Sequence, residues 1–217
     1  MDGDDAMSAA QENYSVSAQE EGFLGKREPR AETGSNASAN GDNRAANAKA
    51  AKNNIVTIKP RGPEWVGNFR QQEKERYKNP TQPWSYTLED GTPAVVAPVC
   101  KKSGLTTKPR EHYLLKTERP SFITILCLVR DAAAKLPNGV GTRADICELL
   151  RESQYINENI PEKNINDIVS GALDRLHYEV DPCVRYDSDK KLWLYLHRDR
   201  PLDSKLWDEN LESNGKV

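Results

Sequence analysis

The sequence lacks long apolar runs and closely spaced cysteines. No window approaches a membrane-spanning length of about 18 apolar residues, and the opening MDGDDAMSAA is acidic, without the apolar centre of a secretory signal. The four cysteines, Cys100, Cys127, Cys147 and Cys183, form no CxxC pair. These absences predict a soluble intracellular protein whose cysteines act as small buried hydrophobic residues, because zinc sites and disulfide frameworks use closer spacing.

Catalytic motifs are also missing. The three histidines, His112, His177 and His197, lie far apart, and the sequence has neither a glycine-rich phosphate loop nor a nucleophile elbow. His177 and His197 could approach Cys183 after folding, but a further zinc ligand at suitable spacing is lacking. We therefore predict a protein that is not an enzyme and that binds no metal, cofactor or small-molecule substrate.

A strong net charge is absent as well. Lys and Arg number 31 and Asp and Glu number 33, which gives a net charge of -2. This balance excludes a uniformly basic nucleic-acid-binding protein, so any contact with phosphates must come from a local patch. Residues 55–118 contain such a patch, since Lys and Arg outnumber Asp and Glu there and aromatic residues lie between them.

Apolar residues divide the chain into four parts. Residues 1–54, rich in Ala, Asn and Ser, predict a disordered arm because they cannot bury enough surface to offset the entropy of ordering. Residues 55–118 predict a basic, aromatic-containing tether, with a short helix over 68–78 and a hairpin formed by 84–88 and 94–97. This tether could pack along its own folded domain, lie in the groove of another subunit or bind nucleic acid. Residues 119–200 predict the folded domain, and 201–217 a polar, frayed tail.

The folded domain begins with three amphipathic patterns. Ser121 is the expected N-cap of the first helix, and Thr142, with Asp145 three residues later, predicts a capping box for the second. Pro161 precedes the third, the longest of the three patterns. The apolar residues with helical spacing are Phe122, Ile125, Leu126, Val129, Ala133 and Leu136, then Ile146, Leu149 and Leu150, then Ile165, Ile168, Val169, Ala172, Leu173 and Leu176.

Two short strands follow, over 183–187 and 191–197, separated by a turn at 188–190. Alternation places Leu192, Leu194 and Leu196 on one face, which we expect to pack on the helices, and Trp193 and Tyr195 on the outward face. Three helices and a two-stranded wing predict an α+β, winged-helix-like domain.

Several stretches also resemble a known family. The sequences VRDAAAKLPNGVGTRADICELLRESQYI, SGALDRLHYEVDPCVRYD and KLWLYLHRDR resemble the C-terminal part of plant members of the nuclear factor related to kappa-B-binding protein family. The sequences WVGNFRQQEKERYKNP, VVAPVCKKSG and REHYLLKTERP resemble the stretch that precedes that part. The resemblance covers residues 59–200.

This resemblance implies a nuclear, non-catalytic subunit of an ATP-dependent chromatin-remodelling complex of the inositol-requiring class, with a role in transcription regulation. Its partners would be other subunits of that complex. Family proteins are far longer and have an N-terminal domain that engages a ubiquitin C-terminal hydrolase. Since residues 1–54 match nothing in that domain, this function is not carried over.

A winged helix can bind protein or DNA, so the surface must distinguish the two. The expected third helix bears more acidic than basic residues, which favours protein contact. The predicted partner-binding residues are Trp193, Tyr195, Tyr178 and Arg175. In the alternative, residues 55–118 contact DNA or a nucleosome weakly, and the DNA-contacting residues of the domain are Lys163, Asn164, Asn166, Arg185, Lys190 and Lys191.

Overall fold

The structure, a computed structural model, describes residues 55–100 and 111–207. The predicted arm over 1–54 and the last part of the predicted tail, 208–217, lie outside these residues. Within them, one hydrophobic core joins elements from both ends of the described chain.

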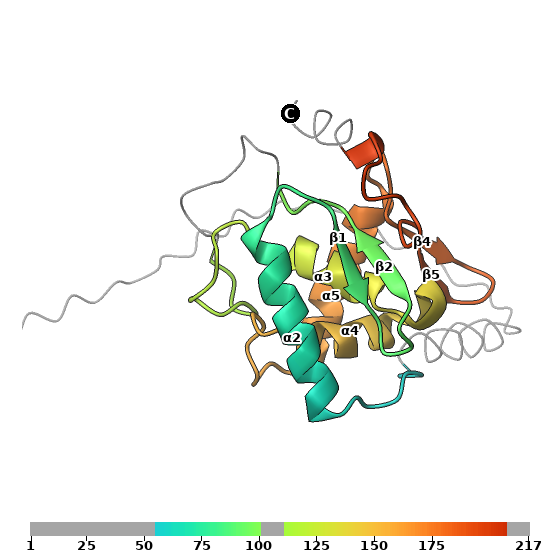
Figure 1. Ribbon diagram of the computed structural model, residues 1–217. Coiled ribbons are helices and arrows are strands. Elements are labelled where there is room, and N and C mark those ends of the chain that lie inside the picture. The colour runs from blue at the N-terminus through green and yellow to red at the C-terminus, as the bar shows by residue number, and fades with distance from the viewer. Residues whose placement is uncertain (1–54, 101–110, 208–217) are drawn as a thin grey trace, which may run out of the picture. The chain divides into compact units, whose positions relative to one another are not determined.

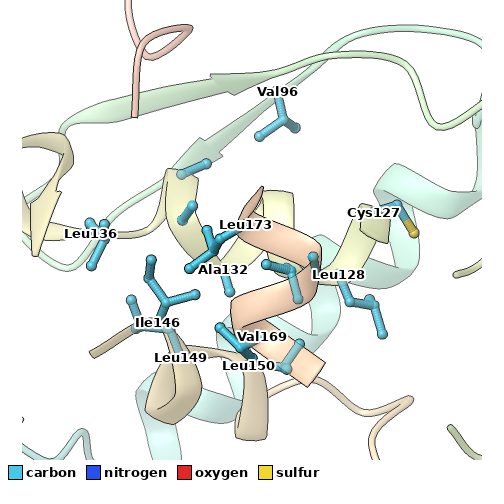
Figure 2. Packing of buried hydrophobic residues seen from close by; sticks show 14 of the residues in the cluster. Val96, Cys127, Leu128, Ala132, Leu136, Ile146, Leu149, Leu150, Val169 and Leu173 are labelled. Carbon is cyan, nitrogen blue, oxygen red and sulfur yellow. The ribbon is translucent and has the colours of Figure 1, made fainter. Parts of the chain in front are cut away.

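Three helices make the centre of that core: α3 (Ile125–Ala134), α4 (Arg143–Arg151) and α5 (Glu162–His177). Their apolar faces meet as the helical spacing predicts, and Figure 2 shows Leu149 and Leu150 of α4 beside Val169 of α5. The predicted three-helix arrangement is confirmed.

One of the two predicted N-caps is confirmed and the other is not. Thr142 caps α4 through the predicted capping box, because its hydroxyl accepts a hydrogen bond from the Asp145 backbone N–H and the Asp145 side chain accepts one from the Thr142 N–H. The cap of α3 is Thr124, whose hydroxyl accepts from the Cys127 N–H, so the prediction of Ser121 is wrong. The chain before Thr124 forms turns instead of a first helical turn.

The wing is a three-stranded antiparallel sheet in the order β3 (Val140–Gly141), β5 (Leu192–Tyr195), β4 (Val184–Asp187). Both predicted strands are present, but β3 was missed, because two residues carry no detectable alternation. A side chain at Gly141 would place its Cβ 2.5 Å from Leu136 Cδ2, so a larger residue there would force the buried Leu136 side chain to shift.

The predicted faces of the wing are reversed. Trp193 and Tyr195 are only 7% and 5% exposed, whereas Leu196 is 40% exposed. The aromatic face has the larger apolar area to remove from water, and the Tyr195 hydroxyl donates to the Val95 carbonyl at 2.8 Å. The sequence alternation was therefore correct, but the choice of inward face was wrong.

The helix and the hairpin predicted within residues 55–118 are both present, and this segment packs along its own folded domain, one of the three arrangements considered for it. Residues 63–96 fold into α2 (Pro63–Lys78), β1 (Trp84–Thr87) and β2 (Pro93–Val96), with β1 and β2 paired antiparallel. The helix starts five residues before the predicted 68–78, with Pro63 in its first turn, where proline is tolerated. Figure 1 shows α2 and the β1–β2 hairpin lying in front of α3 and α5. We call α2, β1 and β2 the N-terminal layer.

The N-terminal layer shares the core of the winged helix. Its buried apolar residues are Phe69, Tyr77, Tyr86, Ala94 and Val96, and Leu88 of the turn between β1 and β2 joins them. Figure 2 shows Val96 across the cluster from Leu149 and Leu150. A two-stranded hairpin is marginal by itself, so burial against α3 stabilises it.

The ends of the described chain are also held. Leu114 and Leu115 are buried, and Leu115 forms an antiparallel bridge to Ile156. Trp207 is buried, and its indole N–H donates to the Pro201 carbonyl at 2.8 Å. Trp207 is thus packed against the domain, whereas Leu202 and Leu206 of the predicted tail are exposed.

Candidate functional site

The outward face of α5 decides whether this winged helix suits DNA. Its fully exposed charged residues are Glu162, Lys163, Asp167, Asp174 and Arg175. Three carboxylates against two cations make this face mildly acidic. Because duplex DNA presents about one negative charge per 1.7 Å of axis, the helix that would enter a major groove is repelled by it.

The three α5 residues predicted to contact DNA differ in availability. Lys163 is exposed, whereas Asn164 and Asn166 are half-buried. Asn166 donates from Nδ2 to the Glu162 carbonyl at 3.1 Å, and its Oδ1 accepts a long hydrogen bond from Cys147 Sγ at 3.6 Å. The amide of Asn166 is therefore engaged within the domain rather than held ready for a base edge.

On the wing, Arg185 and Lys190 are exposed and Lys191 is half-buried. Asp187 lies beside them, accepting the backbone N–H groups of Asp189 and Lys190 at 3.0 Å, and it forms an ion pair with Lys190 Nζ at 3.8 Å. The hydrogen bond from the Lys190 backbone is the largest influence that lowers the Asp187 pKa. Asp187 thus stays ionised and offsets part of the positive charge of the wing tip.

The four predicted partner-binding residues separate into two pairs. Trp193 and Tyr195 are buried core residues, so the prediction that they contact a partner is wrong. Tyr178, at the C-terminal end of α5, is 82% exposed, and Arg175 one turn earlier is also exposed. This second pair lies on the surface as a docking residue must.

Val180, two residues after Tyr178, is 79% exposed and was not predicted. A valine is a weak signal in sequence, because only the fold shows that the chain leaves α5 with this side chain pointing to solvent. Tyr178 and Val180 are thus two large exposed apolar residues at the end of α5, of which only Tyr178 was predicted. We call Arg175, Tyr178 and Val180 the α5-end surface.

A cavity of about 210 Å³ lies next to the α5-end surface. Glu179 and Asp181, which flank Val180, line it together with Arg130 of α3, His197 and Trp207. Two guanidinium nitrogens of Arg130, Nε and Nη2, are buried and donate no hydrogen bond to the described part of the chain. The cavity wall beside Tyr178 and Val180 is therefore polar, and two hydrogen-bond donors of Arg130 in it have no acceptor among the described residues.

Burial and charge set the protonation states in this wall. Burial is the largest influence on Glu179 and raises its pKa. The bidentate contact from Arg200 lowers the pKa of Asp181. Burial lowers the pKa of His197 to about 4, so its imidazole is neutral at physiological pH while Nε2 lies 3.2 Å from Asp181 Oδ1.

The proposed encounter of His177, His197 and Cys183 does not form a metal site within residues 55–100 and 111–207, where no group of three metal-ligating side chains occurs. His177 Nδ1 lies 3.3 Å from the Val184 carbonyl, and His197 faces Asp181. Cys127, Cys147 and Cys183 are buried as predicted, and burial raises the pKa of both Cys147 and Cys183 to about 12. These groups support packing and recognition rather than nucleophilic chemistry.

As to membranes, none of the helices in the described part of the chain combines the length and the apolar character that a bilayer crossing requires.

Comparisons with known proteins agree with this architecture. Residues 65–203 match the family model of the NFRKB second winged helix domain, a range that includes both the N-terminal layer and the wing. A curated relative, the nuclear factor related to kappa-B-binding protein of Xenopus tropicalis, is 51% identical over 146 residues, which are 66% of this chain and 12% of that protein. The chain therefore spans about an eighth of the length of this relative. No solved structure matches. Since the family model covers more than half of the chain, the protein belongs to the family of the NFRKB second winged helix domain.

Proposed function

We propose that this protein is a non-catalytic subunit of a nuclear, ATP-dependent chromatin-remodelling complex of the inositol-requiring class, in which its winged-helix domain docks another protein. Family membership supports the complex. The docking role rests on a difference between two parts of the α5 surface. Its outward face is acidic, and its C-terminal end presents Tyr178 and Val180 to solvent.

The α5-end surface has the composition of a protein-binding hot spot. Tyrosine and arginine dominate interface energies because they combine apolar area with a polar group at modest entropic cost. Tyr178 packs edge-on against the His177 ring, with ring centroids 4.8 Å apart, so its position is partly defined before a partner arrives. The neighbouring cavity provides room for a side chain of the partner.

DNA binding through the wing is the second candidate, because Arg185 and Lys190 are exposed on it. Under this candidate the basic residues of the wing grip phosphates while α5 stays out of the groove. The acidity of α5 makes it the weaker of the two readings.

One experiment separates the two functions. The tagged full chain is purified from nuclease-treated nuclei, and the associated proteins are identified by mass spectrometry. We expect remodelling subunits with the wild-type chain and a loss of about tenfold or more with Tyr178→Ala/Val180→Ser, because truncating an aromatic anchor costs about 2 kcal/mol or more.

The matched control is Lys190→Glu/Lys191→Glu on the wing, which should retain these subunits. An association that nuclease treatment abolishes, and that the wing variant loses while the α5-end variant keeps it, would contradict the docking proposal and establish DNA contact instead.

A further inference from the structure

A groove of about 490 Å³ opens at the side of the N-terminal layer. It lies where the segment entering α2, the first half of α2 and the C-terminal end of α4 meet. Its lining residues are Val56, Ile58, Lys59, Pro60, Arg61, Val66, Arg70, Glu148, Arg151 and Glu152. We call it the basic groove.

The basic groove carries excess positive charge. Four of its lining residues are cations and two are carboxylates. One of the carboxylates, Glu152, is already committed, because its Oε2 accepts hydrogen bonds at 3.3 Å from Arg61 Nη1 and from Lys135 Nζ. Lys135, a buried lysine outside the groove lining, therefore shares Glu152 with Arg61 and leaves this carboxylate less able to repel an anionic ligand.

Three of the cations can still reach a ligand. Lys59 is exposed. Arg70 uses Nε for the Glu152 carbonyl at 2.9 Å, a contact that fixes the guanidinium at the groove. Half-buried Arg151 has two long contacts, from Nε to the carboxylate of exposed Glu148 at 3.7 Å and from Nη1 to the Ile160 carbonyl at 3.5 Å. Contacts at these distances are weak, so a carboxylate from a partner can compete for Arg151.

Apolar side chains lie among these charges. Val56 is exposed, and Ile58, Pro60 and Val66 line the same groove. Phosphodiester backbones offer nothing that would cover this apolar area, whereas a peptide can place a Leu or Phe on it while its carboxylates meet the cations. The mixture therefore fits an acidic peptide better than a nucleic acid.

The start of α2 adds to the attraction for anions. Its N-cap is Gly62, which has no side chain to accept from the first-turn N–H groups. The positive end of the helix dipole is thus uncapped where α2 enters the groove, although Glu64 lies in the first turn.

We propose that the basic groove binds an acidic segment of a partner protein in which apolar side chains lie between Asp and Glu residues. The proposal deepens the docking function above and rests on it, since it states the chemistry of one segment that this domain recognises. The groove and the α5-end surface share no residue, so each can be disabled separately.

The test uses the purified full chain and a short fluorescein-labelled peptide in which Leu alternates with Asp and Glu, with binding measured by fluorescence anisotropy. The comparison ligands are the same peptide with Ser in place of Leu and a labelled DNA duplex. We expect Lys59→Glu/Arg70→Gln to weaken peptide binding by about tenfold or more, because charge loss and reversal replace attraction by repulsion. Lys190→Glu/Lys191→Gln on the wing is the control, with the same change of charge, and should leave peptide binding unchanged.

Val56→Ser tests the apolar part without touching a charge. It should weaken binding of the Leu peptide several-fold and leave binding of the Ser peptide unchanged. If circular dichroism shows that Lys59→Glu/Arg70→Gln fails to fold, Val56→Ser still tests whether the peptide binds in the groove.

Equal binding of the Leu peptide by the wild type and both groove variants would overturn the proposal. Duplex binding that is tighter than peptide binding and is lost with Lys59→Glu/Arg70→Gln would also overturn it, by identifying a nucleic-acid interface. If the groove binds the peptide but remodelling subunits do not co-purify, the groove proposal stands and the proposed function fails. If the subunits co-purify and the peptide does not bind, the proposed function stands and the groove proposal fails.

Discussion

The N-terminal layer and the three-helix centre contribute to one core, but different forces hold them. The helices α3, α4 and α5 meet through apolar faces that recur with helical spacing. The N-terminal layer adds to its apolar contacts a set of buried charged groups, each bound to a residue far away in the sequence. Periodicity therefore reveals the first region, whereas the second becomes recognisable only when its distant partners are known.

Asp131 of α3 is the main anchor of the layer. Its carboxylate, almost fully buried, accepts hydrogen bonds from Arg76 Nε at 2.7 Å and Nη2 at 2.9 Å. It also accepts from the hydroxyls of Tyr77 at 3.1 Å and Tyr86 at 3.0 Å. Such a network is costly to disturb, because every member is buried away from water that could replace a lost partner.

Two further contacts hold α2. Glu73, buried, accepts from Ser153 Oγ at 2.6 Å and from the Gln154 backbone N–H at 3.1 Å. Lys135 Nζ donates to the Leu149 carbonyl at 2.9 Å and lies 3.3 Å from the centre of the Phe69 ring. These contacts link α2 to the C-terminal ends of α3 and α4. We therefore expect the N-terminal layer and the winged helix to unfold together.

The largest expected effect comes from Asp131→Ala. It leaves Arg76 as a buried charge without its counterion and leaves the Tyr77 and Tyr86 hydroxyls without their acceptor, which should lower the free energy of unfolding by about 3–5 kcal/mol. Urea denaturation followed by circular dichroism and by tryptophan fluorescence measures this loss. Coincident transitions from the two probes would confirm a single cooperative unit.

The double variant Arg76→Met/Asp131→Leu sharpens that result. It removes both charges together, and we expect it to regain much of the stability lost in Asp131→Ala. If Asp131→Ala leaves unfolding of the helical centre unchanged, the N-terminal layer unfolds independently of the winged helix, and the expectation that the two unfold together is wrong.

An intermediate effect is expected from His197, which lines the cavity between the end of β2 and α3. Its pKa in the folded protein is about 4, below the ordinary 6.5, so the unfolded chain takes up the proton first as pH falls. Its contribution to stability is therefore complete above pH 6.5 and decreases between pH 6.5 and about 4, by roughly 1.4 kcal/mol per pH unit at most.

Thermal unfolding across this range, compared between wild type and His197→Gln, isolates the contribution. The variant should lose the part of the slope that comes from His197 and from its contact with Asp181, since His197 helps to lower the pKa of Asp181. Glu179, whose raised pKa acts with the opposite sign, is present in both proteins and cancels in the difference. Identical slopes would show that His197 titrates alike in the folded and unfolded states.

The smallest effect is expected where the segment before α2 meets α4. Thr142 caps α4, and its hydroxyl also donates to the Ile55 carbonyl at 2.9 Å, while Asp145 accepts from the Thr57 backbone N–H at 2.6 Å. Thr142→Ala should cost about 1 kcal/mol, the usual effect of losing an N-cap. Thr117→Ala, at an exposed position, is the control and should change the free energy of unfolding by less than about 0.5 kcal/mol.

Much of the helical centre could be predicted because local rules decide it. The apolar face of α5 follows from Ile165, Val169 and Leu173 at helical spacing, and the start of α4 follows from the Thr142 cap. The acidity of the outward α5 face could also be predicted, because the helical period of 3.6 residues places the charged residues opposite the apolar face. The family could be identified from the residues as well.

The candidate site was less predictable. Tyr178 and Arg175 were found because they fall outside the apolar stripe of α5. Val180 and the basic groove were missed, since their meaning depends on neighbours supplied by the fold: the groove joins Lys59 and Arg70 to Arg151, about 80 residues away along the chain.

The sequence by itself determined the three helices, the two longer strands of the wing, β4 and β5, and the alternation of their side chains, because each depends on residues a few positions apart. Only the tertiary structure decided which face of the wing turns inward, since Tyr195 is buried against Val95 of the N-terminal layer and Trp193 against the His177 ring at the end of α5. It also decided that Arg76 and Glu73 are core residues rather than solvated charges on a tether. Their burial is favourable only because Asp131 and Ser153, 55 and 80 residues later, complete their hydrogen bonds.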